Sequence, residues 1–167
     1  EMDDFWGDLL ELSEGRRSSH FFGQIVTFRN PDGNQELIDG QQRLTSSSIL
    51  LAAMRDIAMK AYAEHREEMS PDTGDTLRDI RRDVKKFLRG DGDQPSLILQ
   101  KGNKDRDGVD ANGYFEHLVH GSIYHAYTEP TKNMQAAYSF FTQAINKRLK
   151  LLTTWSERVD WLNRTFH

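Results

Sequence analysis

Apolar residues recur every three or four positions through most of this chain, which is the spacing of one face of an α-helix. In the N-terminal half this pattern predicts a short helix that begins near Asp3 and ends near Gly15. It also predicts a longer helix that runs from Leu44 to about residue 68, where Ser70 and Pro71 end it.

The C-terminal half is predicted to be mainly helical. After a linker-like stretch from Pro71 to Asp75, the same spacing predicts helices over 77–88, 114–120 and 134–149. A last helix is expected from Thr154, because Thr154-Trp155-Ser156-Glu157 has the form of a capping box.

Two segments change to the pattern of strands. A strand from His20 to Phe28, a turn at 30–34 and a returning strand from Gln35 to Ile38 predict a β-hairpin. The helix that follows is expected to be buried against this sheet. A further short strand is predicted over 97–100, followed by a polar and mobile loop over 103–113.

These elements predict an α+β protein in two parts. Residues 1–70 would form a small α/β core with the hairpin, and residues 71–167 a mainly helical extension packed on it.

The amino-acid composition narrows the range of functions that the protein can have. With 22 Lys and Arg against 26 Asp and Glu, the net charge of -4 argues against a generic DNA-binding module, because such binding depends on cations that neutralise phosphates. The chain contains no Cys, which excludes disulfides, thiolate metal sites and a cysteine nucleophile. It shows no apolar run of membrane-spanning length and no secretory leader, so we expect a cytoplasmic protein without a membrane partner.

Three patterns of candidate chemistry have plainer explanations. A basic helix face is better explained as a solvated surface, because Asp79 and Asp83 can pair with Arg82 and Lys86; it comprises Arg78, Arg81, Arg82, Lys85, Lys86 and Arg89. The loop at 103–108 resembles the start of a calcium loop, but Tyr114 stands where that loop needs a bidentate Glu. The spacing of His117, His120 and His125 matches no zinc class, so no metal site is expected in the protein.

The most informative stretch is Asp39-Gly40-Gln41-Gln42-Arg43, which joins the predicted second strand to the following helix. Gly40 lets the backbone approach a ligand closely, and the first turn of a helix offers unpaired N–H groups. Arg43 carries a planar fork of donors that matches phosphate oxygens. The junction therefore predicts a phosphate site, with a plain turn in which Asp39 caps the helix as the alternative. From the chemistry of the side chains alone, a ligand-binding role is a better explanation than a structural role only for Gly40 and Arg43.

The residue sequence of this stretch resembles the signature of the DGQQR-motif domains. These domains lie at the N-terminal end of modification-dependent restriction proteins of the GmrSD type. Further stretches are similar to other parts of that family pattern: Phe22-Gly23-Gln24-Ile25-Val26, Leu97-Ile98-Leu99 with Asp105-Arg106 and Tyr114-Phe115, and Asn133 to Phe141.

The chain departs from the family pattern in two places. The family carries a Tyr-Gln-Arg-Pro-Tyr-x-Trp element before the first helix, and this chain begins too late to contain it, so we expect an N-terminally incomplete domain. Members that cut DNA also carry a nuclease domain of the His-Asn-His type, and no such motif occurs here. Nuclease activity is therefore not expected in this fragment, and a C-terminal nuclease domain or a partner subunit is the expected partner.

The resemblance implies a fold of the ParB and sulfiredoxin type and a regulatory domain that binds and hydrolyses a nucleoside triphosphate with Mg²⁺. In that interpretation Arg43 contacts the β- and γ-phosphates, while Gly40 and the backbone of Gln41 allow close phosphate approach. Thr45 would stand at the helix N-terminus and contact the magnesium ion.

The catalytic roles that the resemblance implies fall on Asp39, Gln42 and Arg43. Asp39 would hold Mg²⁺ or position water, and Gln42 would orient the attacking water. The alternative function is a non-enzymatic module that recognises modified DNA and binds a DNA phosphate with the same turn. A scaffold that binds neither ligand is a third possibility.

Overall fold

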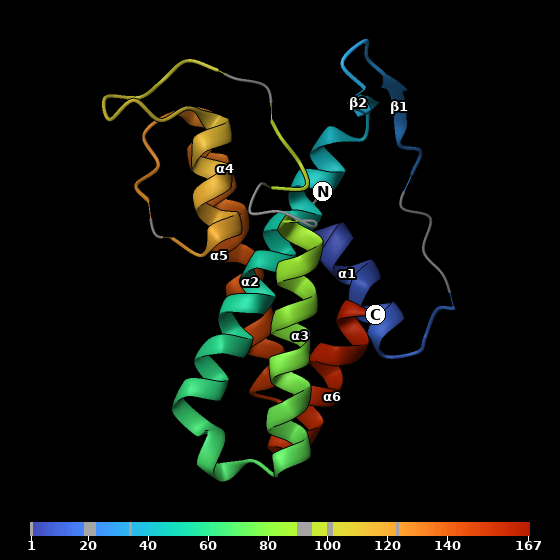
Figure 1. The fold of residues 1–167 in the computed structure, drawn as a ribbon. Helices are drawn as coiled ribbons and strands as arrows, with labels where there is room; N and C mark the ends of the chain where they lie inside the picture. The colour runs from blue at the N-terminus through green and yellow to red at the C-terminus, as the bar shows by residue number, and fades with distance from the viewer. Residues whose placement is uncertain (1, 19–22, 34, 90–94, 100–101, 123) are drawn as a thin grey trace.

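The protein is a bundle of helices from which a β-hairpin projects at one end (Figure 1). This computed structural model describes residues 2–18, 23–33, 35–89, 95–99, 102–122 and 124–167. The elements in chain order are α1 (Met2–Ser13), β1 (Val26–Arg29), β2 (Gln35–Asp39), α2 (Gln41–His65), the 3₁₀ turn η1 (Arg66–Glu68), α3 (Pro71–Arg89), α4 (Ala111–His120), α5 (Glu129–Leu149) and α6 (Trp155–Phe166).

This element order confirms the predicted α+β class, with one hairpin and a mainly helical remainder. The predicted boundary near residue 70 between two domains stays a prediction, as does the likeness to the ParB and sulfiredoxin type. Among the helices that the structure describes, none combines the length and the apolarity needed to cross a membrane.

Helix α2 is the centre of the hydrophobic core. Ala52, Ala53 and Met54 in its middle have 0% exposure, and α3 and α5 pack along it. Small residues at 52 and 53 let the neighbouring helices approach closely. The expectation that this helix would be buried is therefore correct, but the expectation that a sheet would cover it is wrong, because helices cover it instead.

The β-hairpin is exposed. Strands β1 and β2 pair antiparallel, with an irregularity between Val26 and Thr27, and in the described residues they form a two-stranded sheet with no third strand. Phe28 is 46% exposed and Ile38 is 66% exposed, so the apolar residues that precede the motif are not buried as predicted. Only Leu37 of the two strands is half-buried.

The first strand is shorter than predicted. It begins at Val26 rather than His20, and residues 23–25 are described without strand pairing. Residues 19–22 of the predicted strand lie outside the described residues. The turn at 30–33 and the return at Gln35 agree with the prediction.

Three local predictions in the second half are wrong. Helix α3 begins at Pro71 without a linker, because proline suits the first helical position and Ser70 Oγ accepts the N–H of Thr73 at 3.2 Å. Residues 97–99 form no strand, and the N–H of Leu99 donates to Asn112 Oδ1 at 2.8 Å. Helix α4 begins within the predicted loop, because the carboxylate of Asp110 caps it.

The capping box at the start of α6 is confirmed. Thr154 Oγ1 accepts the N–H of Glu157 at 3.2 Å, and Glu157 Oε2 accepts the N–H of Thr154 at 2.9 Å. The backbone N–H groups of Thr154 and Thr153, which both donate to Glu157 Oε2, hold the pKa of the Glu157 carboxyl below its usual range. The box is local in sequence, which explains why it could be predicted from four residues.

A buried arginine connects three helices. Arg55 of α2 is 4% exposed; it donates to the carbonyls of Leu118 and Val119 at the end of α4 and pairs with Asp56 at 2.8 Å. Tyr138 of α5 donates its hydroxyl to the other Asp56 oxygen at 2.7 Å. Burial, followed by the contact with Asp56, raises the pKa of Tyr138. Arg55 thereby adds donors to carbonyls at the end of α4, where the regular hydrogen bonds of the helix stop.

We expect Arg55→Met to lower the free energy of unfolding by about 3 kcal/mol, because it removes one donor from each of the Leu118 and Val119 carbonyls and the cation that pairs with Asp56. Urea unfolding followed by circular dichroism measures this loss. Arg66→Met on the exposed η1 turn is the control, with an expected loss below about 0.5 kcal/mol. Equal losses in the two variants would show that the Arg55 network does not contribute specifically.

Candidate functional site

The motif forms the predicted junction between a strand and a buried helix. Strand β2 ends at Asp39, helix α2 begins at Gln41, and Gly40 between them occupies the N-cap position. The alternative in which Asp39 caps the helix is thus wrong: its Oδ1 instead accepts the N–H of Gly40 at 2.7 Å. Among the described residues, no side chain caps the first turn of α2.

Gly40 is required by both conformation and contact. Its φ of 94° lies in the left-handed region, which residues with a Cβ adopt only at a cost. The residue is buried, and a Cβ there would lie 3.1 Å from Cγ1 of Ile25, just before β1. The glycine therefore lets the chain reverse tightly against the segment that leads into the hairpin.

Arg43 joins this turn to the segment that precedes β1. Its Nη2 lies 3.2 Å and 3.3 Å from the two carboxylate oxygens of Asp39, and its Nη1 donates to the carbonyl of Gln24 at 2.9 Å. The guanidinium also lies against Gly23, where a Cβ would be 1.9 Å from Nη1. In this structure Arg43 therefore has a structural role as well as the chemistry to bind an anion.

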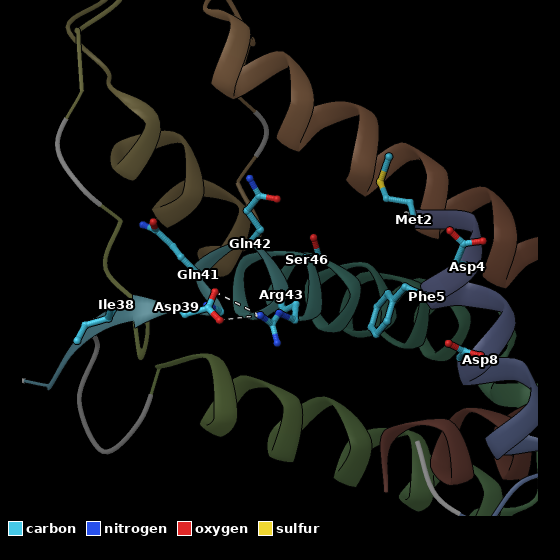
Figure 2. A pocket seen from close by; sticks show the side chains of 11 residues that line it. Met2, Asp4, Phe5, Asp8, Ile38, Asp39, Gln41, Gln42, Arg43 and Ser46 are labelled. Atoms are coloured by element: carbon cyan, nitrogen blue, oxygen red, sulfur yellow. Dashed lines mark hydrogen bonds and ion pairs between the residues drawn. The ribbon is translucent and has the colours of Figure 1, made fainter. Parts of the chain in front are cut away.

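The motif lines a pocket of about 660 Å³ between α2 and α1 (Figure 2). Its walls are formed by Met2, Asp4, Phe5 and Asp8 of α1 on one side, and by Ile38, Asp39, Gly40, Gln41, Gln42, Arg43 and Ser46 on the other. Residues 39–43, which join the end of β2 to the first turn of α2, therefore all line one concave pocket.

Thr45 is the one predicted site residue that does not line the pocket. Its hydroxyl donates to the carbonyl of Gln41 at 2.8 Å, one helical turn back. The other predicted residues are all brought together there: Asp39, Gly40, Gln41, Gln42 and Arg43. Their proposed roles stay predictions.

The wall provided by α1 was missed by the sequence analysis, which treated that helix only as an apolar packing element. Phe5 is half-buried and lies in the wall, with Asp4 before it and Asp8 one turn after Asp4. Asp8 pairs with Arg17 at 2.8 Å. The i, i+4 spacing of the two carboxylates indicated that they share a face, but nothing local indicated that this face meets residues 38–46. Ser46 also lines the pocket and was not among the predicted site residues.

Charge is distributed unevenly in the pocket. Arg43 is the only cationic side chain among the described residues that line it, and it stands beside the first turn of α2, whose N–H groups carry positive partial charge. Asp4 and Asp8 stand on the α1 side. The α2 side therefore suits an anion better than the α1 side does.

The other candidate chemistries are not supported by the geometry. Arg82 on α3 pairs with Asp79 at 2.7 Å and with Asp83 at 3.1 Å, as expected for a solvated helix face. Asp105 accepts the N–H groups of Asp107 and Val109 at 2.9 Å with one oxygen, which ties it into a turn.

The predicted absence of a histidine metal cluster stays a prediction. The ring of His117 stacks on Tyr124 with a centroid distance of 4.9 Å. Within the described ranges, no group of three acidic or histidine side chains is placed to hold a metal ion.

Comparison with known proteins identifies a family for the whole chain. The model of the family described as "GmrSD restriction endonuclease, N-terminal domain" matches residues 1–166. No curated protein and no solved structure matches the chain. The resemblance noted from the DGQQR stretch is therefore confirmed.

We expect Gly40→Ala to destabilise the protein by about 2 kcal/mol, because it adds a contact with Ile25 to the strain of a left-handed alanine. Gly33→Ala is a matched control: Gly33 also has a positive φ, of 86°, but a Cβ there would meet nothing within 4 Å. Its expected loss is about 1 kcal/mol. Urea unfolding of both variants measures the difference, and losses of equal size would contradict a close approach at Gly40.

Proposed function

This chain belongs to the family of GmrSD restriction endonuclease N-terminal domains, and we propose that it is the nucleotide-binding and nucleotide-hydrolysing regulatory domain of a modification-dependent restriction protein. The observation that carries the proposal is the position of the Asp39 to Arg43 turn in the wall of a 660 Å³ pocket. That volume is within the range of small-molecule sites, roughly 300 to 1,000 Å³.

The ion pair between Arg43 and Asp39 is compatible with this function, because it is weak enough to be exchanged. The two side chains are 36% and 60% exposed, and pairs of that kind contribute roughly 0 to 1 kcal/mol. A phosphate offers Arg43 more charge and a better geometric match than one carboxylate at 3.2 Å. The arrival of a triphosphate would release Asp39 and keep the guanidinium satisfied.

The released groups match the needs of a magnesium–triphosphate complex. Mg²⁺ is usually held by one or two carboxylates together with the phosphates of the substrate, and Asp39 is the carboxylate beside Arg43. The N–H groups of Gln41 and Gln42 in the first turn of α2 would approach the phosphates next to Gly40. Thr45 is left out of this set, because its hydroxyl already donates to Gln41.

Hydrolysis in this site requires only that the attacking water is positioned and that the charge on the transferred phosphoryl group is stabilised. Water attacks the γ-phosphorus, the bond to the β–γ bridging oxygen breaks, and nucleoside diphosphate, phosphate and a proton leave. Gln42, whose amide both donates and accepts, would orient the water, and Arg43 would stabilise charge on the transferred group.

DNA cleavage is assigned to another part of the restriction protein. The family description calls this domain the N-terminal part of an endonuclease. We therefore propose a nuclease domain or partner subunit as the partner, with modified DNA as the ligand of the full-length protein.

We expect Arg43→Ala to weaken the binding of nucleoside triphosphate and Mg²⁺ at least about tenfold, because charge-assisted hydrogen bonds to the phosphates are lost. The expected loss of folding stability stays under about 1 kcal/mol, since the pair with Asp39 is exposed. Isothermal titration calorimetry and urea unfolding measure the two quantities.

The matched control for this variant is Arg29→Ala, which removes an exposed arginine from β1 and should leave binding unchanged. Unfolding of Arg43→Ala would show that the contacts of Arg43 with Asp39 and Gln24 are essential for folding, against the small stability loss expected. Salt-sensitive binding of modified duplex without any nucleotide binding would favour the DNA-recognition module instead.

A second expectation concerns cleavage: the purified chain, incubated with modified phage DNA, nucleotide and Mg²⁺, should produce no cut DNA. The reason is the absence of a nuclease motif in its sequence together with its net charge of -4. Gel electrophoresis of the DNA is the measurement. Products that disappear with Arg43→Ala would place a nuclease centre in this chain and overturn the assignment.

A further inference from the structure

The two walls of the pocket differ in chemistry (Figure 2). The wall from α2 carries Arg43 and the N-terminal turn of a long helix, whereas the wall from α1 carries the Phe5 ring between Asp4 and Asp8. A bare polyphosphate is anionic along its whole length and matches only the first wall. A nucleotide has an anionic end and an uncharged aromatic end, and it matches both.

We propose that the nucleoside half of the ligand binds to α1, with its base against Phe5, and that this contact makes the site selective for a nucleoside triphosphate over inorganic triphosphate. This inference rests on the proposed function. It assigns Phe5 as the residue that contacts the base and Asp4 as a specificity-determining residue, neither of which belongs to the DGQQR stretch.

The ring of Phe5 is well placed to act as a rigid surface. It is half-buried, and it meets Phe141 of α5 edge-on, with a centroid distance of 6.0 Å and an interplanar angle of 81°. Phe141 itself has 0% exposure, so the ring is fixed to the core. An aromatic side chain held in place stacks on any base, because every base has a π-face.

The carboxylates beside Phe5 orient the ligand. Like charges repel, so Asp4 and Asp8 disfavour a phosphate near α1, while the same oxygens accept hydrogen bonds from the N–H and O–H groups of a base or ribose. Asp8 is half-buried and pairs with Arg17 at 2.8 Å, whereas Asp4 is an exposed residue of the pocket wall. The triphosphate is thereby directed to Arg43.

The test compares the affinities of the four nucleoside triphosphates and inorganic triphosphate, each with Mg²⁺, by calorimetry on this chain. In the unmodified chain we expect at least one nucleotide to bind roughly tenfold more tightly than inorganic triphosphate. Phe5→Leu, which keeps an apolar contact with the core, should remove most of this preference without changing the affinity for inorganic triphosphate. Phe5→Tyr keeps the ring and should retain the preference.

Asp4→Asn provides an independent arm that does not disturb the core. It should raise the affinity for inorganic triphosphate about twofold to fivefold, because one like charge is removed from the pocket. Asp3→Asn is the matched control: it removes the same charge from the neighbouring position of α1, outside the pocket wall, and should change little.

The outcomes separate this inference from the proposed function. Equal binding of nucleotides and inorganic triphosphate by the unmodified chain would overturn the role of Phe5 and leave the phosphate site at Arg43 standing. Binding of neither ligand would overturn both. If Phe5→Leu does not fold, a lost preference in a folded Phe5→Tyr, or identical effects of Asp4→Asn and Asp3→Asn, would still refute the inference.

Discussion

The burial of α2 is the constraint on which the rest of the structure depends. This one helix begins at the DGQQR turn and passes through the centre of the core, where Ala52 to Met54 are fully covered by neighbouring helices. Because its middle is close-packed, its first turn cannot move without disturbing that packing. A rigid helix thereby presents Gly40 and Arg43 in a fixed place, which is what a site that works by positioning charge requires.

The second wall of the pocket depends on the same core. Helix α1 is attached to it by aromatic contacts: Phe5 meets Phe141, and Trp6 meets Trp161 at a centroid distance of 6.3 Å. Trp161 is 1% exposed, so α1 is fixed by residues from the far end of the chain. Both walls are thus held by one set of packed helices, although the exposed hairpin leads directly into one of them. The pocket can remain formed without a large sheet to support it.

Asp39 and Arg43 combine an observed structural role with the proposed phosphate-binding role at an exposed turn. Their ion pair, together with the bond from Arg43 to the Gln24 carbonyl, ties the end of β2 and the start of the hairpin to α2. The pair is exposed and therefore contributes little stability, so the same groups remain available to a stronger anionic partner. The buried arginine, Arg55, differs in this respect: its side chain is 4% exposed and donates to two backbone carbonyls of α4 inside the fold, where a ligand could not replace it.

The sequence alone determined the features that depend on neighbours in the chain. Helical periodicity located the helices, four residues identified the capping box at Thr154, and the Asp39 to Arg43 stretch identified both the family and one wall of the site. Tertiary structure decided what depends on distant packing: that helices rather than a sheet cover α2, that Ile38 stays exposed, and that Phe5 faces the motif. Periodicity shows that a helix has an apolar face, but it cannot show which element that face meets. For that reason the α1 wall of the pocket could not be predicted from the sequence, because packing on α5 and α6 places it opposite the start of α2.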